Sequence, residues 1–385
     1  MRSISRLLLF SFIVCHSLSC STSKKSTNAI TASNISSLKF LGEYDLPHNL
    51  PFNNTTVGGL SSIDYDIKND CYYMICDDRS AINPARFYTA KIFFTAHSID
   101  SVRFIDVKSL LQPNGNVYPN NKQDKMHVPD PEAMRYNPSS GNLVWSSEGE
   151  RIIKSKDTVL EDPEINIISK DGKYQGNFPL PSNLKMQLTE KGPRQNGVLE
   201  GMSFADHYRT LYVNVEEPLY EDGPRADVTD NNTFIRLLKF DVASKQNTKQ
   251  FAYKLEPVAH PAKPENEFKI NGVPDILWLG NNKLMVTERS FSTGRMACTI
   301  RVFIADLSNA TDIKEISSLK ANKDFKPVQK KLLLNMDDLG IYIDNIEGAT
   351  FGPVLPNGHK TLLFVADNNF AVAEKTQFLL FEVME

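Results

Sequence analysis

Short apolar segments that alternate with polar positions recur along almost the whole chain and predict β-strands. In the first such unit, a strand GLSSIDYD is followed by a polar turn and a second strand, CYYMIC, and then by ARFYTAKIFF and SVRFIDV. Period-2 alternation, β-branched and aromatic residues, and turns of Gly, Pro and Asn are typical of strands, whereas a helical period is weak throughout. The pattern therefore predicts an all-β protein.

The units themselves repeat along the chain. Five times, a strand that opens with Gly, Asp or Glu is followed one hairpin later by another acidic cluster, as in EGMSFADH and NVEEP. The openings recur about every 70 residues, and self-similarity at a fixed period indicates a repeat architecture. Their marker residues are Gly59, Glu132, Glu200, Asp275 and Glu347.

The number of strands per unit predicts how the repeats close. Four units have four strands each, but the fifth unit, EGATFG, TLLFVAD and TQFLLFEV, has three. The segment LKFLGEYDLP, from Leu38, precedes the first unit and supplies the missing strand. An N-terminal strand that completes the last unit closes the ring of a β-propeller, and closure removes exposed sheet edges. We therefore predict a five-bladed β-propeller, with a sixth blade within 218–233 or 254–272 as the alternative.

The start of the chain has the layout of an export signal. Two arginines precede an apolar run that is too short to span a membrane, and small residues follow. Cys20 resembles the lipidated cysteine of a bacterial lipoprotein, although Ser17 replaces the usual Leu, and plain secretion is the alternative. We expect a signal at 1–20, a polar leash at 21–37 and a single propeller domain at 38–385. The protein would then lie in the periplasm or on the outer membrane, held to a membrane only through a lipid on Cys20.

Composition narrows the classes of function. Lys and Arg number 43 against 46 Asp and Glu, for a formal net charge of -3, and no basic stripe predicts a nucleic-acid partner. After the signal only Cys71, Cys76 and Cys298 remain, without the spacing of a zinc site. Cys71 and Cys76 lie on one predicted strand at an odd separation, so their side chains point to opposite faces. We expect buried, unpaired thiols.

The acidic residues at the strand ends are the candidate functional residues. Antiparallel pairing brings the start of an inner strand beside the end of its hairpin partner. Glu132 is therefore expected beside Glu148, and Asp275 beside Glu288. The same pairing in every blade predicts a ring of carboxylates at one mouth of the central channel, where hard cations such as calcium find oxygen ligands. In the alternative interpretation, the acids only cap turns through bonds to the backbone.

Two arginines stand next to acids of this ring. Arg79 follows two aspartates in CDDRS, and Arg289 follows a glutamate in TERS. A guanidinium binds an anionic group through two parallel hydrogen bonds, which suits a phosphate. Neutralisation of the acidic neighbours is the alternative role for both arginines.

Ten strings in a fixed order resemble those of a known family. Among them are GGLSSIDYD, CDDRS, DPEAMRY, NGVLEGMSF, TERS, DNIEGATFGP and ADNNF. Together they resemble the phytase-like family named for an esterase-like activity of phytase, over nearly all of the chain after the leash. By analogy with calcium-dependent propeller phytases, which have six blades, the resemblance implies hydrolysis of phosphate or carboxylic esters with calcium at the channel mouth.

The resemblance also implies roles for the acids and arginines that lie in matching motifs. Glu200 and Glu347 would orient the attacking water, and Arg79 and Arg289 would bind the phosphate. The implied metal ligands are Asp77, Asp78, Glu132, Glu148, Glu216, Glu288, Asp344 and Asp367.

Three functions follow as hypotheses. The first is an exported, calcium-assisted hydrolase of a small phosphorylated or ester substrate. The second is a non-enzymatic propeller of the cell envelope that binds a ligand or a protein, with metal holding its loops. The third is a glycosidase, which needs two carboxylates about 5–9.5 Å apart, although only Trp145 and Trp278 are available to stack on sugars. Loss of ester hydrolysis on chelation distinguishes the first hypothesis from the other two.

Overall fold

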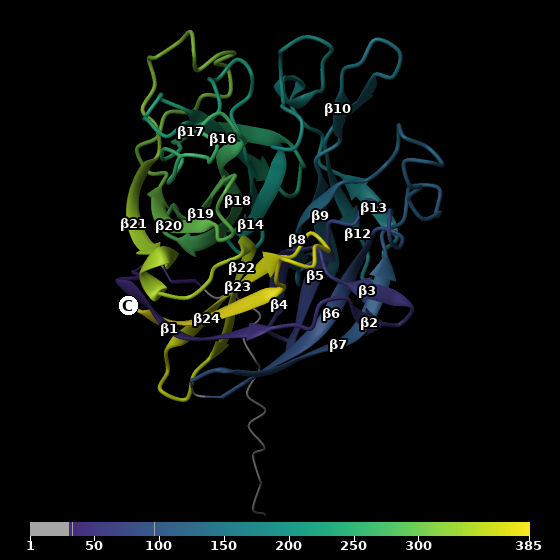
Figure 1. Cartoon of the computed structure of the whole chain (residues 1–385), viewed down its shortest axis with the longest axis vertical. Coiled ribbons are helices and arrows are strands. Elements are labelled where there is room, and N and C mark those ends of the chain that lie inside the picture. The colour runs from purple at the N-terminus through teal and green to yellow at the C-terminus, as the bar shows by residue number, and fades with distance from the viewer. Residues whose placement is uncertain (1–30, 33, 96) are drawn as a thin grey trace, which may run out of the picture.

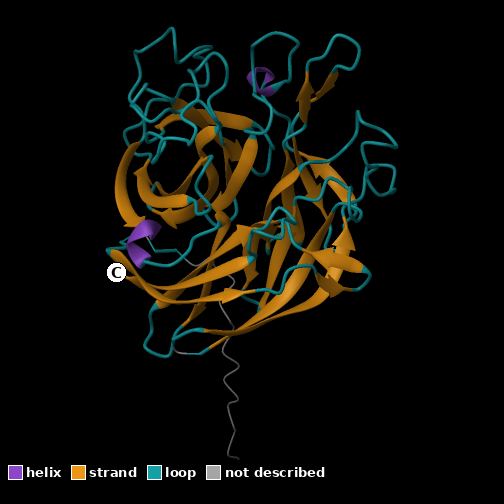
Figure 2. Ribbon diagram, viewed as in Figure 1, coloured by secondary structure: helices purple, strands orange, loops and turns teal. Residues whose placement is uncertain are grey.

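The computed structural model describes residues 31–32, 34–95 and 97–385. The expected signal at 1–20, with Cys20, and residues 21–30 of the expected leash lie outside these ranges, so export and lipidation stay predictions. Within the described ranges no helix is long and apolar enough to cross a membrane. Strands joined by turns and loops make up nearly all of the structure (Figure 2).

Five four-stranded antiparallel sheets form the body of the protein, and each is one blade. In blades 1 to 4 the strands follow one another across the sheet in chain order. Blade 1 consists of β4 (Leu60–Asp66), β5 (Cys71–Cys76), β6 (Arg86–Phe94) and β7 (Ile99–Ser109). Blade 2 consists of β8 (Pro131–Asn137), β9 (Asn142–Ser147), β12 (Glu164–Ile168) and β13 (Tyr174–Asn177). Blade 3 consists of β14 (Leu199–Ala205), β15 (Thr210–Val215), β16 (Phe234–Asp241) and β17 (Asn247–Lys254).

The last two blades complete the ring. Blade 4 consists of β18 (Lys269–Gly280), β19 (Lys283–Ser292), β20 (Thr299–Asp306) and β21 (Gln329–Asn335). Blade 5 consists of β22 (Asn345–Val354), β23 (Lys360–Asp367), β24 (Gln377–Met384) and β1 (Ser37–Asp45). The first strand of each blade contacts its counterparts in the order β4, β8, β14, β18, β22 and back to β4. These five strands are therefore the inner strands of a closed β-propeller.

The N-terminal strand closes the ring as predicted. β1 pairs antiparallel with β24, from Ser37 opposite Met384 to Asp45 opposite Gln377, and the two strands lie side by side in Figure 1. The chain thus joins its first and last strands in one sheet, which gives blade 5 four strands like the others and closes the ring. The alternative of a sixth blade is wrong, because the connections 219–233 and 255–268 contain no strand.

A few short elements decorate the blades. The hairpin β2 (Leu50–Phe52) and β3 (Thr55–Val57) precedes blade 1. A second hairpin, β10 (Glu150–Ile152) and β11 (Val159–Glu161), is inserted between β9 and β12 and extends from the top of the body in Figure 1. The two 3₁₀ turns are η1 (Ser182–Leu184) and η2 (Met336–Leu339).

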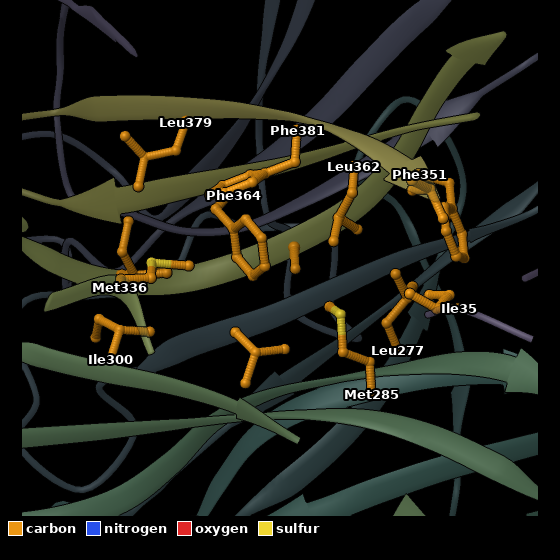
Figure 3. Packing of buried hydrophobic residues seen from close by; sticks show 14 of the residues in the cluster. Ile35, Leu277, Met285, Ile300, Met336, Phe351, Leu362, Phe364, Leu379 and Phe381 are labelled. Atoms are coloured by element: carbon orange, nitrogen blue, oxygen red, sulfur yellow. The ribbon is translucent and has the colours of Figure 1, made fainter. Parts of the chain in front are cut away.

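Apolar side chains between neighbouring blades form the core. Figure 3 shows one such layer, in which Leu277 and Met285 of blade 4 face Leu362 and Phe364 of blade 5. Because each blade packs against a neighbour on both sides, its central strands are buried on both faces, and β5 is buried throughout.

The three cysteines are part of this packing. Cys71 lies in the core between blades 1 and 2, whereas Cys76 lies in the core between blades 1 and 5. Both thiols and that of Cys298 are buried and free, which confirms the expectation of buried, unpaired cysteines on opposite strand faces.

A buried arginine joins the inner strands at the centre of the ring. Arg135 of β8 donates from Nε to the carbonyl oxygen of Met202 (2.6 Å), from Nη1 to that of Ile63 (2.5 Å) and from Nη2 to both oxygens of Asp275 (2.8 and 2.7 Å). Asp275 also accepts the N–H of Ala349 (2.8 Å). These residues come from all five inner strands, so the pair cross-links the propeller at its axis.

Candidate functional site

A cavity of about 490 Å³ opens where the inner strands begin. Blades 1, 2, 3 and 5 line it with carboxylates, whereas blade 4 lines it with an arginine and apolar side chains. The structure brings ten of the residues predicted for the site to this single mouth, and their chemical roles stay predictions. They are Asp77, Arg79, Glu132, Glu148, Glu200, Glu216, Arg289, Asp344, Glu347 and Asp367.

A shared backbone irregularity lies at the mouth end of all five inner hairpins. In each inner hairpin the inner strand has one more residue than its partner strand near the mouth, so the register of pairing shifts there. The shift lies between Pro131 and Met134 in blade 2 and between Leu199 and Met202 in blade 3. A β-bulge of this kind re-aims the side chain next to it. Glu132, Glu200 and Glu347 occupy the shifted positions in their blades, and all three face the cavity.

Three carboxylates of blade 2 form the tightest group. One oxygen from each of Asp130, Glu132 and Glu148 lies within 4.8 Å of the others, and all three residues are buried. Burial, reinforced by the neighbouring carboxylates, raises the pKa of Glu148 to about 8 and holds that of Glu132 well above its usual range. Burial raises the pKa of Asp130 only to about 6, because Arg79 opposes the effect. Three converging oxygen ligands beside a single arginine suit a hard divalent metal ion.

Blades 1 and 5 contribute a second group of acids to the cavity. Burial and the charge of Glu347 raise the pKa of Asp77 to about 8, and burial with the charge of Asp77 raises that of Asp367 well above its usual range. Among the described residues, Oδ1 of Asp77 has no hydrogen-bond partner. It lies so close to Gly59 that a Cβ there would approach it to 2.0 Å. The glycine that the sequence places at this opening therefore makes room for the carboxylate.

Two arginines lie among these acids. Arg79 places Nε 3.4 Å from Asp130 and Nη2 2.5 Å from Glu150. Arg289 bridges blades 3 and 5, since Nη2 pairs with Glu216 (2.5 Å) and Nη1 pairs with Glu347 (3.1 Å). Within the described ranges, the buried Nε of Arg289 has no acceptor. The two guanidinium groups cannot balance the carboxylates around them, so the cavity favours cations.

Some cavity acids also hold loops in place. Glu148 accepts the N–H groups of Gly197 (2.8 Å) and Val198, and Asp344 accepts those of Asn345 (2.9 Å) and Lys375 (2.7 Å). These bonds match the turn-capping role considered from the sequence. At Glu148 both bonds fall on Oε1, so capping and cation binding are compatible at that residue, whereas at Asp344 each oxygen accepts one N–H.

Two of the predicted metal ligands do not reach the cavity. Asp78 pairs with Arg86 (2.7 Å) and accepts backbone N–H groups of the loop that follows it. Glu288 binds Tyr253 (2.8 Å) and Lys330 (2.6 Å) on the other side of blade 4. Their predicted position is wrong because successive residues of a strand, such as Glu288 and Arg289, point to opposite faces, and because Asp78, after the end of β5, is turned to the loop that it caps. Asp77 and Arg289 face the cavity, whereas their neighbours Asp78 and Glu288 face away.

The predicted proximity of Asp275 and Glu288 is also wrong. The bulge in blade 4 places Asp275 opposite Thr287, one residue further along the pair than expected. The carboxylate of Asp275 then points to Arg135 at the axis instead of the mouth.

The comparison with protein families identifies the chain. A family model described as phytase-like, esterase-like activity of phytase, matches residues 55–370. The chain belongs to this family. No curated protein matches the phytase-like chain.

Several solved structures resemble the phytase-like chain in outline. A family-43 β-1,3-galactosidase with galactodeoxynojirimycin is 10% identical, with a TM-score of 0.46, over 88% of this chain and 94% of that chain. An exo-β-1,3-galactanase from Phanerochaete chrysosporium with galactose is 11% identical, with a TM-score of 0.44, over 89% and 64%. The Dos1 propeller is 6% identical, with a TM-score of 0.36, over 86% and 69%. These similarities assign no activity to the phytase-like chain.

Sequence reasoning missed two features of the phytase-like cavity. Asp130 lies two residues before Glu132 in DPEAMRYN, and period-2 alternation alone would have placed both on the same face. The apolar wall formed by Phe268, Ile270 and Phe291 was missed because β18 begins at Lys269, upstream of the repeated motif at Val273. The alternating segment FKINGV was its signal.

Proposed function

We propose that this phytase-like protein hydrolyses small phosphate esters at the acidic cavity with the help of a bound divalent cation, calcium being the best chemical match. The observation that carries the proposal is the buried group Asp130, Glu132 and Glu148, whose three oxygens converge beside a single arginine, Arg79. Membership of the esterase-like family supports a hydrolase. The reaction adds water to the phosphorus atom, breaks the P–O ester bond and releases an alcohol, which takes up a proton.

The residues present fit a metal ion. Asp130, Glu132 and Glu148 would hold it, and Oδ1 of Asp77 on the neighbouring blade 1, which has no hydrogen-bond partner among the described residues, offers a further ligand. Such a cation supplies charge compensation for the phosphate and lowers the pKa of a coordinated water.

The other groups of the cavity bind and orient the reactants. Arg289 is held by Glu216 and Glu347, so its N–H on Nε, which has no acceptor among the described residues, is fixed in direction and can donate to a phosphate oxygen. Arg79 stands beside Asp130, next to the proposed metal group, and is placed to bind a second phosphate oxygen. Glu200 and Glu347 lie between these groups on blades 3 and 5 and would orient the attacking water.

The test is hydrolysis of p-nitrophenyl phosphate by the purified protein with calcium, after chelation, and after calcium is restored. We expect activity to disappear on chelation and to return with calcium. Glu132→Gln should lower kcat/KM by more than the roughly 10–100-fold typical of a metal's outer partners. Glu315→Gln, at an exposed acid outside the cavity, is the matched control and should leave kcat/KM unchanged. Turnover that is insensitive to chelation would rule out the proposal.

One observation favours a second candidate, a binding propeller in which the metal only holds loops. Glu148 ties the loop before β14 through the N–H groups of Gly197 and Val198. In that case calcium should raise Tm by mass action on the folded state, and no phosphate ester should be hydrolysed. Hydrolysis of aryl glycosides that survives chelation would instead indicate a glycosidase.

A further inference from the structure

The apolar wall of the acidic cavity belongs to blade 4. Phe268, Ile270, Phe291 and Met296 line the same cavity as the carboxylates of the other four blades. Phe268 is 51% exposed and Met296 is 69% exposed, and the rings of Phe268 and Phe291 lie 6.2 Å apart. Single exposed apolar residues are common on protein surfaces, but a contiguous group in a cavity marks a binding surface.

An extension of the inner hairpin builds this wall. β18 begins at Lys269, well before the position at which the repeat opens, and β19 continues to Ser292 to pair with it. In this extension Ile270 lies opposite Phe291, and Gly272 lies opposite Arg289. Arg289 and Phe291 are two residues apart on one strand and therefore face the cavity together. The cationic group and the apolar surface are direct neighbours.

Backbone hydrogen bonds hold the wall in place. The N–H of Thr293 donates to the carbonyl oxygen of Phe268 (2.9 Å), and that of Cys298 donates to the carbonyl oxygen of Ile343 (3.0 Å). The hydroxyl of Tyr342 donates to the carbonyl oxygen of Met296 (3.1 Å). The apolar surface is therefore formed before any ligand arrives, which reduces the cost of binding.

The cavity is also larger than a phosphate group requires. Its volume of about 490 Å³ lies within the range of about 300–1,000 Å³ that is typical of sites for whole small molecules. A polyol phosphate would fill this space with hydroxyl groups and would leave the polar side of the ligand against Phe268 and Met296. An aryl or acyl group would instead remove apolar surface from water on both sides.

We propose that the substrates are amphipathic phosphate esters, with the phosphate held at the acidic side and Arg289 and an aryl or acyl group packed on Phe268, Phe291 and Met296. This inference rests on the proposed phosphoesterase function for the site, and it adds the class of the alcohol that is released. Blade 4 selects this leaving group, while the other blades carry the acidic groups.

The test compares benzyl phosphate with glycerol phosphate in the presence of calcium, since both esters release alcohols of similar leaving ability and differ in the apolar ring. We expect kcat/KM to favour the benzyl ester by roughly tenfold or more, the usual value of small apolar differences in a pocket. Phe268→Ala and Met296→Ala should each reduce this preference, mainly through KM for the benzyl ester, and leave glycerol phosphate unaffected. Leu332→Ala, at a residue of β21 that is 48% exposed and outside the cavity, is the matched control.

A binding measurement separates this inference from the proposed function. Calorimetric titration of the calcium-loaded protein with phenyl phosphate and with inorganic phosphate needs no turnover. Tighter binding of phenyl phosphate that Phe268→Ala abolishes supports the inference even where no ester is hydrolysed. Equal affinity for the two ligands, or equal kcat/KM for the two esters, overturns it whether or not hydrolysis occurs. Urea unfolding of each variant confirms that the fold is retained.

Discussion

Arg135 and Asp275 show how a single buried ion pair organises a propeller. The two side chains are almost completely buried, and the guanidinium also binds carbonyl oxygens of neighbouring inner strands. Burial alone would raise the pKa of Asp275 strongly, but Arg135 and the N–H of Ala349 limit the increase to about 6. The carboxylate that the repeat predicts at the mouth is therefore used inside the ring as a cross-link.

Asp275→Asn should destabilise the fold by about 3–5 kcal/mol, because it leaves the guanidinium of Arg135 buried without its counter-ion. Urea unfolding measures the change. Asp45→Asn removes one partner of a solvent-exposed pair with Lys375 and should cost no more than about 1 kcal/mol. A loss for Asp275→Asn as small as that for Asp45→Asn would contradict the structural role.

At the scale of the elements, adjacent charged residues of one strand have different partners, because successive side chains point to opposite faces of the sheet. Arg289 of β19 faces the cavity, and Glu288 beside it faces Lys330 and Tyr253 on the opposite side of the blade. The inserted residue in each inner hairpin then sets which acids reach the mouth. Glu132 and Glu288, both predicted as metal ligands, should consequently respond in opposite ways to neutralisation.

Glu132→Gln should leave the metal-free protein at pH 8 as stable as the parent or more stable, since it removes a carboxyl crowded by Glu200 and Glu148. It should also abolish the increase in Tm on addition of calcium. Glu288→Gln should instead cost about 3 kcal/mol, the loss typical of a broken buried pair, and retain the calcium response. Thermal unfolding of both variants with and without calcium measures these effects. The reverse assignment of the two responses would place the metal at Glu288 of blade 4 and not at the carboxylates of blade 2, which would contradict the proposed site.

At the scale of the whole molecule, the propeller brings many carboxyl groups together at one mouth. The free energy of unfolding therefore depends on pH. Burial and neighbouring carboxylates raise the pKa of Asp77 and Glu148 to about 8 and that of Glu347 to about 7. Between about pH 5 and pH 8 the unfolded chain has released these protons while the folded protein still holds them. The free energy of unfolding without metal must therefore fall as the pH rises through this interval.

We expect the metal-free protein to lose stability between pH 5 and pH 8, by about 1.4 kcal/mol for each pKa unit by which a buried carboxyl is raised within that interval. Calcium should increase the free energy of unfolding by about 2.7 kcal/mol at a concentration 100 times its Kd. This increase should be larger at pH 8 than at pH 5, because protons compete with calcium for the carboxylates at the lower pH. Urea unfolding at the two pH values with chelator or calcium measures both effects. Stability that rises with pH in chelator would show that the carboxyls are not buried together.

The sequence by itself determined the all-β class, the number of blades, the closure by the N-terminal strand and the gathering of acids at one mouth. These properties follow from the period of two along each strand and from the regular spacing of the repeats, and both patterns are visible in the amino-acid sequence. Only the tertiary structure decided that Asp78, Glu288 and Asp275 leave the mouth and that blade 4 brings an apolar wall to it. The reason is that bulges and strand extensions depend on the partner strand, so the face that each residue presents is fixed only when the strands pair.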